Sequence, residues 1–210
     1  MEKLDELIQK GIYALLPAYV PAEGNATKII TADGNAYIDS RVVKTVLKAL
    51  CRYYAVHVEH CREKYGKLIH QRLRVPLPIH RDLLLIPMKV RKPMFRKDGA
   101  CGYINLYAID KIKEKGDHSI FVLKNGMEVE CLQRLRTVHQ HINHARLVER
   151  HAFFHGDGEE GHGAAEGWWE AYDTPATKGD IVLLKKEIVE LVRVLKKTVG
   201  TKKDESYKKE

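Results

Sequence analysis

A basic segment between two apolar runs is the part of the chain best suited to chemistry with phosphates. The apolar runs cover residues 83–86 and 103–109. The cations between them are Lys89, Arg91, Lys92, Arg96 and Lys97. Pro and Gly bound both runs, as they commonly bound β-strands, so the cations are expected on a loop at the edge of a sheet. Such a loop attracts duplex DNA by releasing condensed counterions, whatever the base sequence. An ordinary solvated loop is the alternative, because Lys and Arg prefer water.

The distribution of charge favours a polyanionic partner. Residues 41–113 contain 17 Lys and Arg against 5 Asp and Glu, whereas residues 1–40 and 151–177 have an acidic excess. Positive charge segregated in this way is what an electrostatic footprint for nucleic acid needs, although an anionic membrane surface would be served too. No segment approaches the roughly 18–20 apolar residues of a spanning helix. The first five residues do not begin a signal peptide, so we expect a soluble, cytoplasmic protein without a membrane partner.

Catalytic and metal-binding patterns are weak in this sequence. His139, His141 and His144 lie close together, but their spacing matches no defined metal site and the HExxH pattern is absent. The four cysteines contain no CxxC pair. There is no GxSxG elbow, phosphate-binding P-loop or dinucleotide fingerprint. We therefore expect no enzyme activity, no metal and no cofactor.

The elements that must position the cations predict an α+β fold with a mostly antiparallel sheet. Residues 27–30 and 36–38 flank a hairpin turn, and Asn125-Gly126 forms a second one. Apolar residues at helical spacing predict a long basic helix near residues 41–64, starting at Asp39 or Ser40 and closed by Gly66. A second helix is expected near residues 132–148. Residues 2–10 are expected to form a short helix, and residues 68–81 a linker.

Four segments follow from composition. Residues 1–150 would form the DNA-binding domain, and residues 151–179 an acidic linker rich in Gly and His. Residues 180–199 predict an amphipathic helix, whose apolar side must be covered by the domain or by another copy of the chain. Residues 200–210 are expected to be a disordered, charged tail. The residues predicted to mediate oligomerisation are Leu184, Ile188, Leu191 and Leu195.

Several short patterns follow one another between residues 12 and 145. They are Ile12-Tyr13-Ala14-Leu15-Leu16-Pro17, Lys28-Ile29-Ile30, Tyr37-Ile38, Leu50-Cys51-Arg52-Tyr53-Tyr54, Arg62 with Gly66, Pro76 with Pro78, Leu84-Leu85-Ile86-Pro87, Cys101-Gly102-Tyr103-Ile104 and Phe121-Val122-Leu123-Lys124-Asn125-Gly126. In their order and spacing they resemble the ComK family of competence transcription factors. The likeness fades from Arg150 onward, so activation and assembly could differ from the family's.

The resemblance implies a DNA-binding transcriptional activator. Members of the family act as homo-oligomers at promoters with paired A/T-rich boxes, which they approach from the minor groove. Narrow A-tracts attract inserted Arg and Lys side chains. Charge and loop position, rather than the resemblance, select the expected contacts with double-stranded DNA. They are Arg52, Arg62, Arg72, Arg74, Lys89, Arg91, Lys92, Arg96 and Lys97.

Two other classes of function remain open. A protein-interaction module would bind its partner through the helix at residues 180–199, with the basic block as a solvated surface. An RNA-binding protein would stack bases on aromatic residues interleaved with the cations. Those residues are Tyr53, Tyr54, Tyr65, Phe95, Tyr103 and Tyr107.

Overall fold

The apolar run from Leu83 to Met88 lies at the centre of the fold, and all six of its residues are buried. It forms most of strand β5 (Leu83–Lys89), which pairs with β4 (Leu77–His80) on one side and β6 (Cys101–Asn105) on the other. A strand with one solvated face would alternate apolar and polar residues. The unbroken run therefore reflects a strand that is covered on both faces.

The computed structural model describes residues 4–21, 24–95 and 98–154. All of them belong to one compact unit, Met1–Gly158. The predictions for Arg96, Lys97 and the segments 155–179, 180–199 and 200–210 fall outside the described residues. So does the stripe expected to mediate oligomerisation, which comprises Leu184, Ile188, Leu191 and Leu195.

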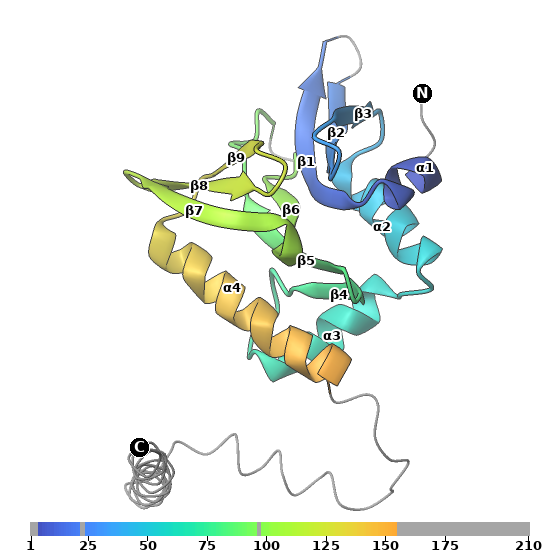
Figure 1. Cartoon of the computed structure of the whole chain (residues 1–210), viewed down its shortest axis with the longest axis vertical. Helices are drawn as coiled ribbons and strands as arrows, with labels where there is room; N and C mark the ends of the chain where they lie inside the picture. The colour runs from blue at the N-terminus through green and yellow to red at the C-terminus, as the bar shows by residue number, and fades with distance from the viewer. Residues whose placement is uncertain (1–3, 22–23, 96–97, 155–210) are drawn as a thin grey trace, which may run out of the picture. The chain divides into compact units, whose positions relative to one another are not determined.

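The main sheet has six strands in the order β3-β2-β1-β6-β5-β4, and every neighbouring pair is antiparallel. Its other strands are β1 (Ile12–Val20), β2 (Gly24–Thr31) and β3 (Ala36–Asp39). Strand β1 pairs with β6 only at Ala14 and Leu15, whereas its pairing with β2 continues to Val20. The outer part of the β1–β2 hairpin therefore projects beyond the rest of the sheet (Figure 1).

Helices cover one face of this sheet. They are α1 (Leu4–Gln9), α2 (Val43–Tyr53) and α3 (Val58–Leu68). Leu47 and Leu50 of α2 share a core with sheet residues that include Leu15 and Leu85. This face of the sheet is thus closed by the three N-terminal helices.

A second sheet and a long helix cover the opposite face. The sheet has the order β7-β8-β9 and comprises β7 (Ile109–Lys115), β8 (His118–Leu123) and β9 (Glu128–Cys131). Helix α4 (Leu135–Glu149) lies against this sheet (Figure 1) and is followed by a short π-helix, Arg150–Phe154. A 3₁₀ turn, Leu106–Ala108, joins β6 to β7. Phe121 and Val138 share this core with Leu84 and Ile86. Consecutive residues such as Leu84 and Leu85 thus enter opposite cores, as the pleat of a strand requires.

The α+β class and the largely antiparallel sheet are confirmed. Both predicted hairpins form, as β2–β3 and as β8–β9 around Asn125-Gly126, and the helix expected near residues 132–148 is α4. Three strands were not predicted, and β1, which continues through Pro17, is one of them. Strand β4 lies within the expected linker at residues 68–81, and β7 is rich in Lys and Glu.

The prediction of one long helix over residues 41–64 is wrong, because the segment forms α2 and α3. Ala55 has a φ of 56°, its amide donates to Arg52 O, and the Val56 amide donates to Cys51 O at 2.8 Å. This is the Schellman arrangement that ends helices, usually with glycine at the left-handed position. The apolar period continues across the break because both helices pack on the same core.

The predicted ends of this helical region also differ. Helix α2 begins after Val42, and Asp39 accepts hydrogen bonds from Arg41 instead of capping the helix. Gly66 lies inside α3 and does not end it. A Cβ at Gly66 would come 2.6 Å from Gln71 O, so this glycine permits a close approach of the chain after α3.

Among the described residues, no helix is both long enough and apolar enough to cross a membrane.

Gly102 lets β1 and β6 approach each other, and its replacement is expected to destabilise the fold. A Cβ there would come 2.8 Å from Leu15 O and 3.0 Å from Val90 Cγ2. We expect Gly102→Ala to lower the free energy of unfolding by about 1–3 kcal/mol through overpacking. Gly99→Ala is the matched control, because a Cβ at Gly99 meets nothing within 4 Å. Urea denaturation followed by circular dichroism measures both, and equal stability of the two variants would contradict the expectation.

The β2–β3 turn should make stability depend on acidic pH. Asp33 accepts hydrogen bonds from the Thr31 hydroxyl and from the amide and side chain of Asn35, and these bonds lower the pKa of its carboxyl to about 2. The folded pKa is below the unfolded one, so this stabilisation is complete above about pH 4 and is lost as the pH falls towards 2. The difference in melting temperature between the wild type and Asp33→Asn should be present at pH 6 and vanish near pH 2. A difference that is independent of pH would contradict this assignment.

Candidate nucleic-acid interface

The connection between β5 and β6, residues 90–100, is fastened to the β1–β2 hairpin by four side chains. We call Tyr19, Asn25, Arg91 and Asp98 the loop clamp. Arg91 Nη2 donates to Asn25 Oδ1 at 2.6 Å, and Arg91 Nε donates to Gly99 O at 2.7 Å. The Arg91 guanidinium also lies over the Tyr19 ring, 4.2 Å from its centroid. The basic loop predicted from the sequence is therefore held against the projecting hairpin.

Asp98 completes the clamp from the other end of the loop. Its carboxylate accepts hydrogen bonds from the Tyr19 hydroxyl, from Asn25 Nδ2 at 2.7 Å and from the Phe95 amide at 3.0 Å. The Tyr19 hydrogen bond is the main cause that lowers the pKa of Asp98, and the charge of Arg91 contributes. Asp98 is thus ionised at neutral pH and balances part of the charge of Arg91.

The tip of the clamped loop exposes apolar side chains. Met94 is 69% exposed and Phe95 is 67% exposed. The Met94 amide donates to Tyr19 Oη at 2.8 Å, and the Asp98 amide donates to Phe95 O at 3.0 Å. The backbone is therefore fixed on both sides of two side chains that face water.

The predicted contacts on this loop have different roles. Lys92 is exposed and forms no ion pair with any described residue. Arg91 is half-buried and occupied by the clamp, so it positions the loop. Of these two cations, Lys92 is the one whose side chain is free to bind a phosphate group.

Arg74 and Lys89 lie around one buried pair, Gln133 and His141. The Lys89 amide donates to Gln133 Oε1 at 2.9 Å, and Gln133 Nε2 lies 3.2 Å from His141 Nε2. Burial chiefly lowers the pKa of His141, and the nearby charge of Arg74 lowers it further. The structure thus brings these two predicted cations to the same neighbourhood, at the end of β5 from which the clamped loop leaves.

Three other predicted contacts lie elsewhere. Arg62 Nη2 donates to Tyr103 Oη at 3.0 Å on the helical face of the sheet. Arg72 is exposed in the connection between α3 and β4. Arg52 is exposed in the last turn of α2. The seven predicted cations that the structure describes therefore do not form one cluster.

The aromatic residues considered for RNA stacking are likewise spread over the fold, and only some of them are exposed. Tyr65 and Tyr103 are buried and belong to the core clusters. Tyr53 and Phe95 are the exposed members of the set, and they lie on α2 and on the clamped loop, respectively. The structure therefore does not provide a continuous row of stacking rings from these six residues.

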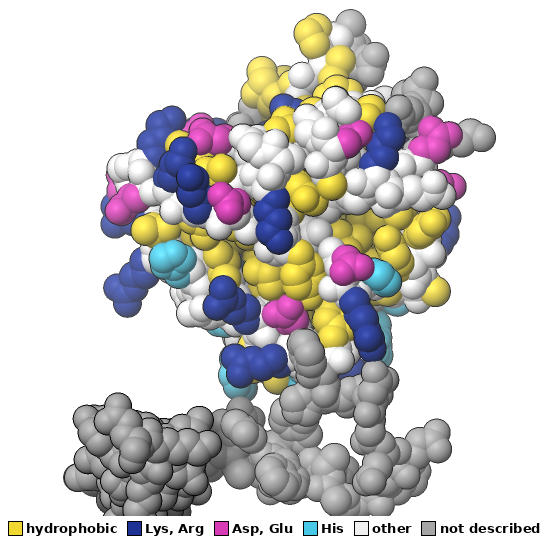
Figure 2. Space-filling model, viewed as in Figure 1, with side chains coloured by type: hydrophobic (Ala, Val, Ile, Leu, Met, Phe, Trp, Pro, Cys, Tyr) yellow, Lys and Arg dark blue, Asp and Glu magenta, His cyan; other side chains and the backbone are white. Residues whose placement is uncertain are grey.

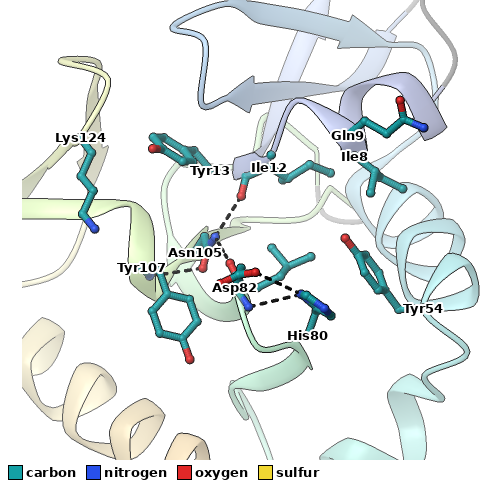
Figure 3. A pocket seen from close by; sticks show the side chains of 12 residues that line it. Ile8, Gln9, Ile12, Tyr13, Tyr54, His80, Asp82, Asn105, Tyr107 and Lys124 are labelled. Carbon is teal, nitrogen blue, oxygen red and sulfur yellow. Dashed lines mark hydrogen bonds and ion pairs between the residues drawn. The ribbon is translucent and has the colours of Figure 1, made fainter.

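A pocket of about 390 Å³ opens between α1, the start of β1, the end of β4 and the turn after β6 (Figure 3). Asn105 lies in its lining, and its side chain is saturated: Nδ2 donates to Ile12 O and Asp82 O, and Oδ1 accepts from the Leu84 and Tyr107 amides. His80 lies 3.6 Å from Asp82, and both side chains are well exposed. The described lining contains no Ser, Thr or Cys that this pair could activate.

The face of the protein in Figure 2 carries charge of both signs. Lys and Arg side chains alternate there with Asp and Glu around a central area of hydrophobic atoms. On β7, for example, Lys113 lies 2.7 Å from Glu128 and Lys115 lies 3.1 Å from Glu130. Mixed charge of this kind does not make the single-signed surface that concentrates a polyanion.

The two buried thiols and the potential metal ligands offer no competing site in the described part of the chain. Burial raises the pKa of Cys51 to about 12 and that of Cys131 to about 11, so both thiols stay protonated. Among the described residues, no three His, Cys, Asp or Glu side chains are arranged to hold a metal ion. The clamped loop is the most specific functional candidate.

Sequence reasoning found the cations of this loop but missed Tyr19, Asn25 and Asp98. Tyr19 and Asn25 face each other across the β1–β2 hairpin, and both are more than 70 positions from Asp98. Only the antiparallel pairing of β1 with β6 brings them together. The one local signal was an acidic residue placed among the loop's cations.

Comparison of the chain with protein-family models, curated proteins and solved structures finds no match. The resemblance to the ComK family stays a prediction.

Removing Arg91 should affect stability, whereas removing Lys92 should not. Arg91→Ala deletes two hydrogen bonds and the contact with the Tyr19 ring, and we expect it to lower the free energy of unfolding by about 1–2 kcal/mol. Lys92→Ala removes the same charge from an exposed position and should change stability by less than about 0.5 kcal/mol. Urea denaturation of the two variants gives the comparison. A stable Arg91→Ala protein would show that the clamp does not hold the loop.

Proposed function

We propose that this chain is a DNA-binding transcriptional regulator that contacts double-stranded DNA through the clamped loop and the cations beside it. The supporting observation is the loop clamp itself. It fixes a basic loop at the end of a rigid sheet and leaves Lys92 at the surface. A loop held in this way loses little conformational entropy on binding, which favours affinity.

The charges around the loop support a phosphate-binding role. Lys89 and Arg74 lie at the end of β5 next to it, and neither forms an ion pair with a described residue. Phosphate contacts from such side chains would supply affinity and register, whereas base selection needs contacts in a groove. The resemblance to the ComK family adds A/T-rich promoter sites and homo-oligomeric assembly to the proposal, which also keeps the cytoplasmic location expected from the sequence.

The test is the salt dependence of duplex binding. We expect Lys89→Ala/Lys92→Ala to weaken binding to an A/T-rich duplex and to reduce the slope of log K against log salt by about two, because each phosphate contact contributes about 0.9. The measurement is fluorescence anisotropy of labelled duplexes, A/T-rich and G/C-rich, between low and physiological salt. Both lysines are outside the clamp's side-chain contacts, so the fold should be retained.

The matched control is Lys113→Ala/Lys115→Ala. It removes the same charge from β7, where both lysines are paired with glutamates. An equal loss of binding in the two variants would mean that only net charge matters, and would contradict the proposal. Tighter binding of single-stranded RNA than of duplex DNA would instead support the RNA-binding alternative, for which the exposed Tyr53 beside Arg52 is the best structural argument.

A further inference from the structure

Met94 and Phe95 lie side by side in the chain at the tip of the clamped loop, and both are exposed despite their size. We propose that these two side chains form an apolar wedge that enters duplex DNA between stacked base pairs and bends it. The inference rests on the proposed function and adds a mode of recognition to it. Apolar side chains inserted at a base step partly unstack it and kink the duplex.

The geometry of the tip supports insertion. The Met94 amide is bonded to Tyr19 Oη, and the backbone of Phe95 is bonded in both directions to Asp98. These bonds hold the backbone of the tip against the hairpin while both side chains stay exposed. A wedge must keep its position while it separates two bases, and this backbone is ordered before the partner arrives.

The charges beside the tip identify the partner as anionic. Lys92 is two positions from Met94 and has no ion pair with a described residue. Asp98 is the acidic group of this region, and its carboxylate is occupied by Tyr19, Asn25 and the Phe95 amide. A phosphate approaching the loop would therefore meet a free ammonium group next to an apolar tip.

A duplex fits these features better than a membrane surface does. Membrane-binding segments bury a broad apolar face and do not need a fixed backbone. Here the apolar area is two adjacent side chains after Pro93, and four side chains from three parts of the chain fix the loop. That arrangement is suited to a narrow gap such as an opened base step.

The experiment compares Met94→Ser/Phe95→Ser with Phe95→Leu. Both changes are at exposed positions, so unchanged circular dichroism and urea denaturation will show that the fold is retained. We expect the double variant to bind an A/T-rich duplex about tenfold more weakly, in the range of aromatic contacts with bases, with an unchanged salt slope. It should also lose the DNA bend measured by energy transfer between dyes at the duplex ends. Phe95→Leu keeps an apolar wedge and should retain the bend.

Leu73→Ser is the matched control, because Leu73 is 79% exposed and lies between Arg72 and Arg74. It should leave both affinity and bend unchanged. Equal weakening by Leu73→Ser would show general apolar adhesion and overturn the wedge. A double variant that binds and bends DNA like the wild type would also overturn the wedge. If its binding still depended steeply on salt, the proposed function would stand.

Absence of any duplex binding by the wild type would instead overturn the proposed function itself. In that case, sedimentation with vesicles containing phosphatidylserine tests the remaining anionic surface. Vesicle binding that the double variant loses would assign the tip to membranes and exclude the wedge.

Discussion

The buried side chain of Asn105 is the polar interaction on which the arrangement of the main sheet depends. It is 4% exposed, and its amide joins the start of β1, the β4–β5 turn, β5 and the turn after β6. The side-chain nitrogen donates two hydrogen bonds and the side-chain oxygen accepts two, so neither polar atom is buried without a partner. A hydrophobic replacement would leave buried backbone groups without partners. The alignment of β1 beside β6, and hence the approach of the β1–β2 hairpin to the clamped loop, begins from this point.

The two ends of β5 and β6 consequently serve different purposes. At one end, Asn105 hydrogen-bonds four backbone groups and lines the pocket. At the other end, the chain leaves Lys89, passes through the clamp and returns at Cys101. Arginine is suited to the clamp because its planar fork can donate to Asn25 and Gly99 while it stacks on Tyr19. Lysine has no such geometry, and Lys92 remains at the surface as a mobile charge.

The sequence was informative where local chemistry decides structure. Asn125-Gly126 predicted its hairpin because such a turn needs a residue with positive φ, and Gly126 has a φ of 83°. The end of α2 was hidden because Ala55 takes the left-handed position that glycine usually occupies. Strand β7 was not predicted because most of its side chains are charged, and two of them, Lys113 and Lys115, pair with glutamates of β9 across β8. The end of α2 is a local exception to the preference for glycine, whereas β7 depends on contacts between strands that no local pattern records.

The candidate site shows the same division. Charge and the flanking apolar runs located the basic loop. They could not show that Arg91 and Lys92 have different roles, because both are cations at neighbouring positions. Their separation depends on Tyr19 and Asn25, which reach the loop only through strand pairing. The apolar tip was visible in sequence only as Phe95 among cations, and its exposure follows from hydrogen bonds of the backbone.

The projecting hairpin also bears on how the protein avoids aggregation. Beyond Leu15, one side of β1 pairs with no strand of the described part of the chain, and an open strand edge of this kind can recruit a strand from another molecule. Pro17 lies in this outer part of β1 and has no amide hydrogen to donate. A foreign strand could not continue its ladder past this residue. The proline therefore protects the hairpin against edge-to-edge association while leaving its pairing with β2 in place.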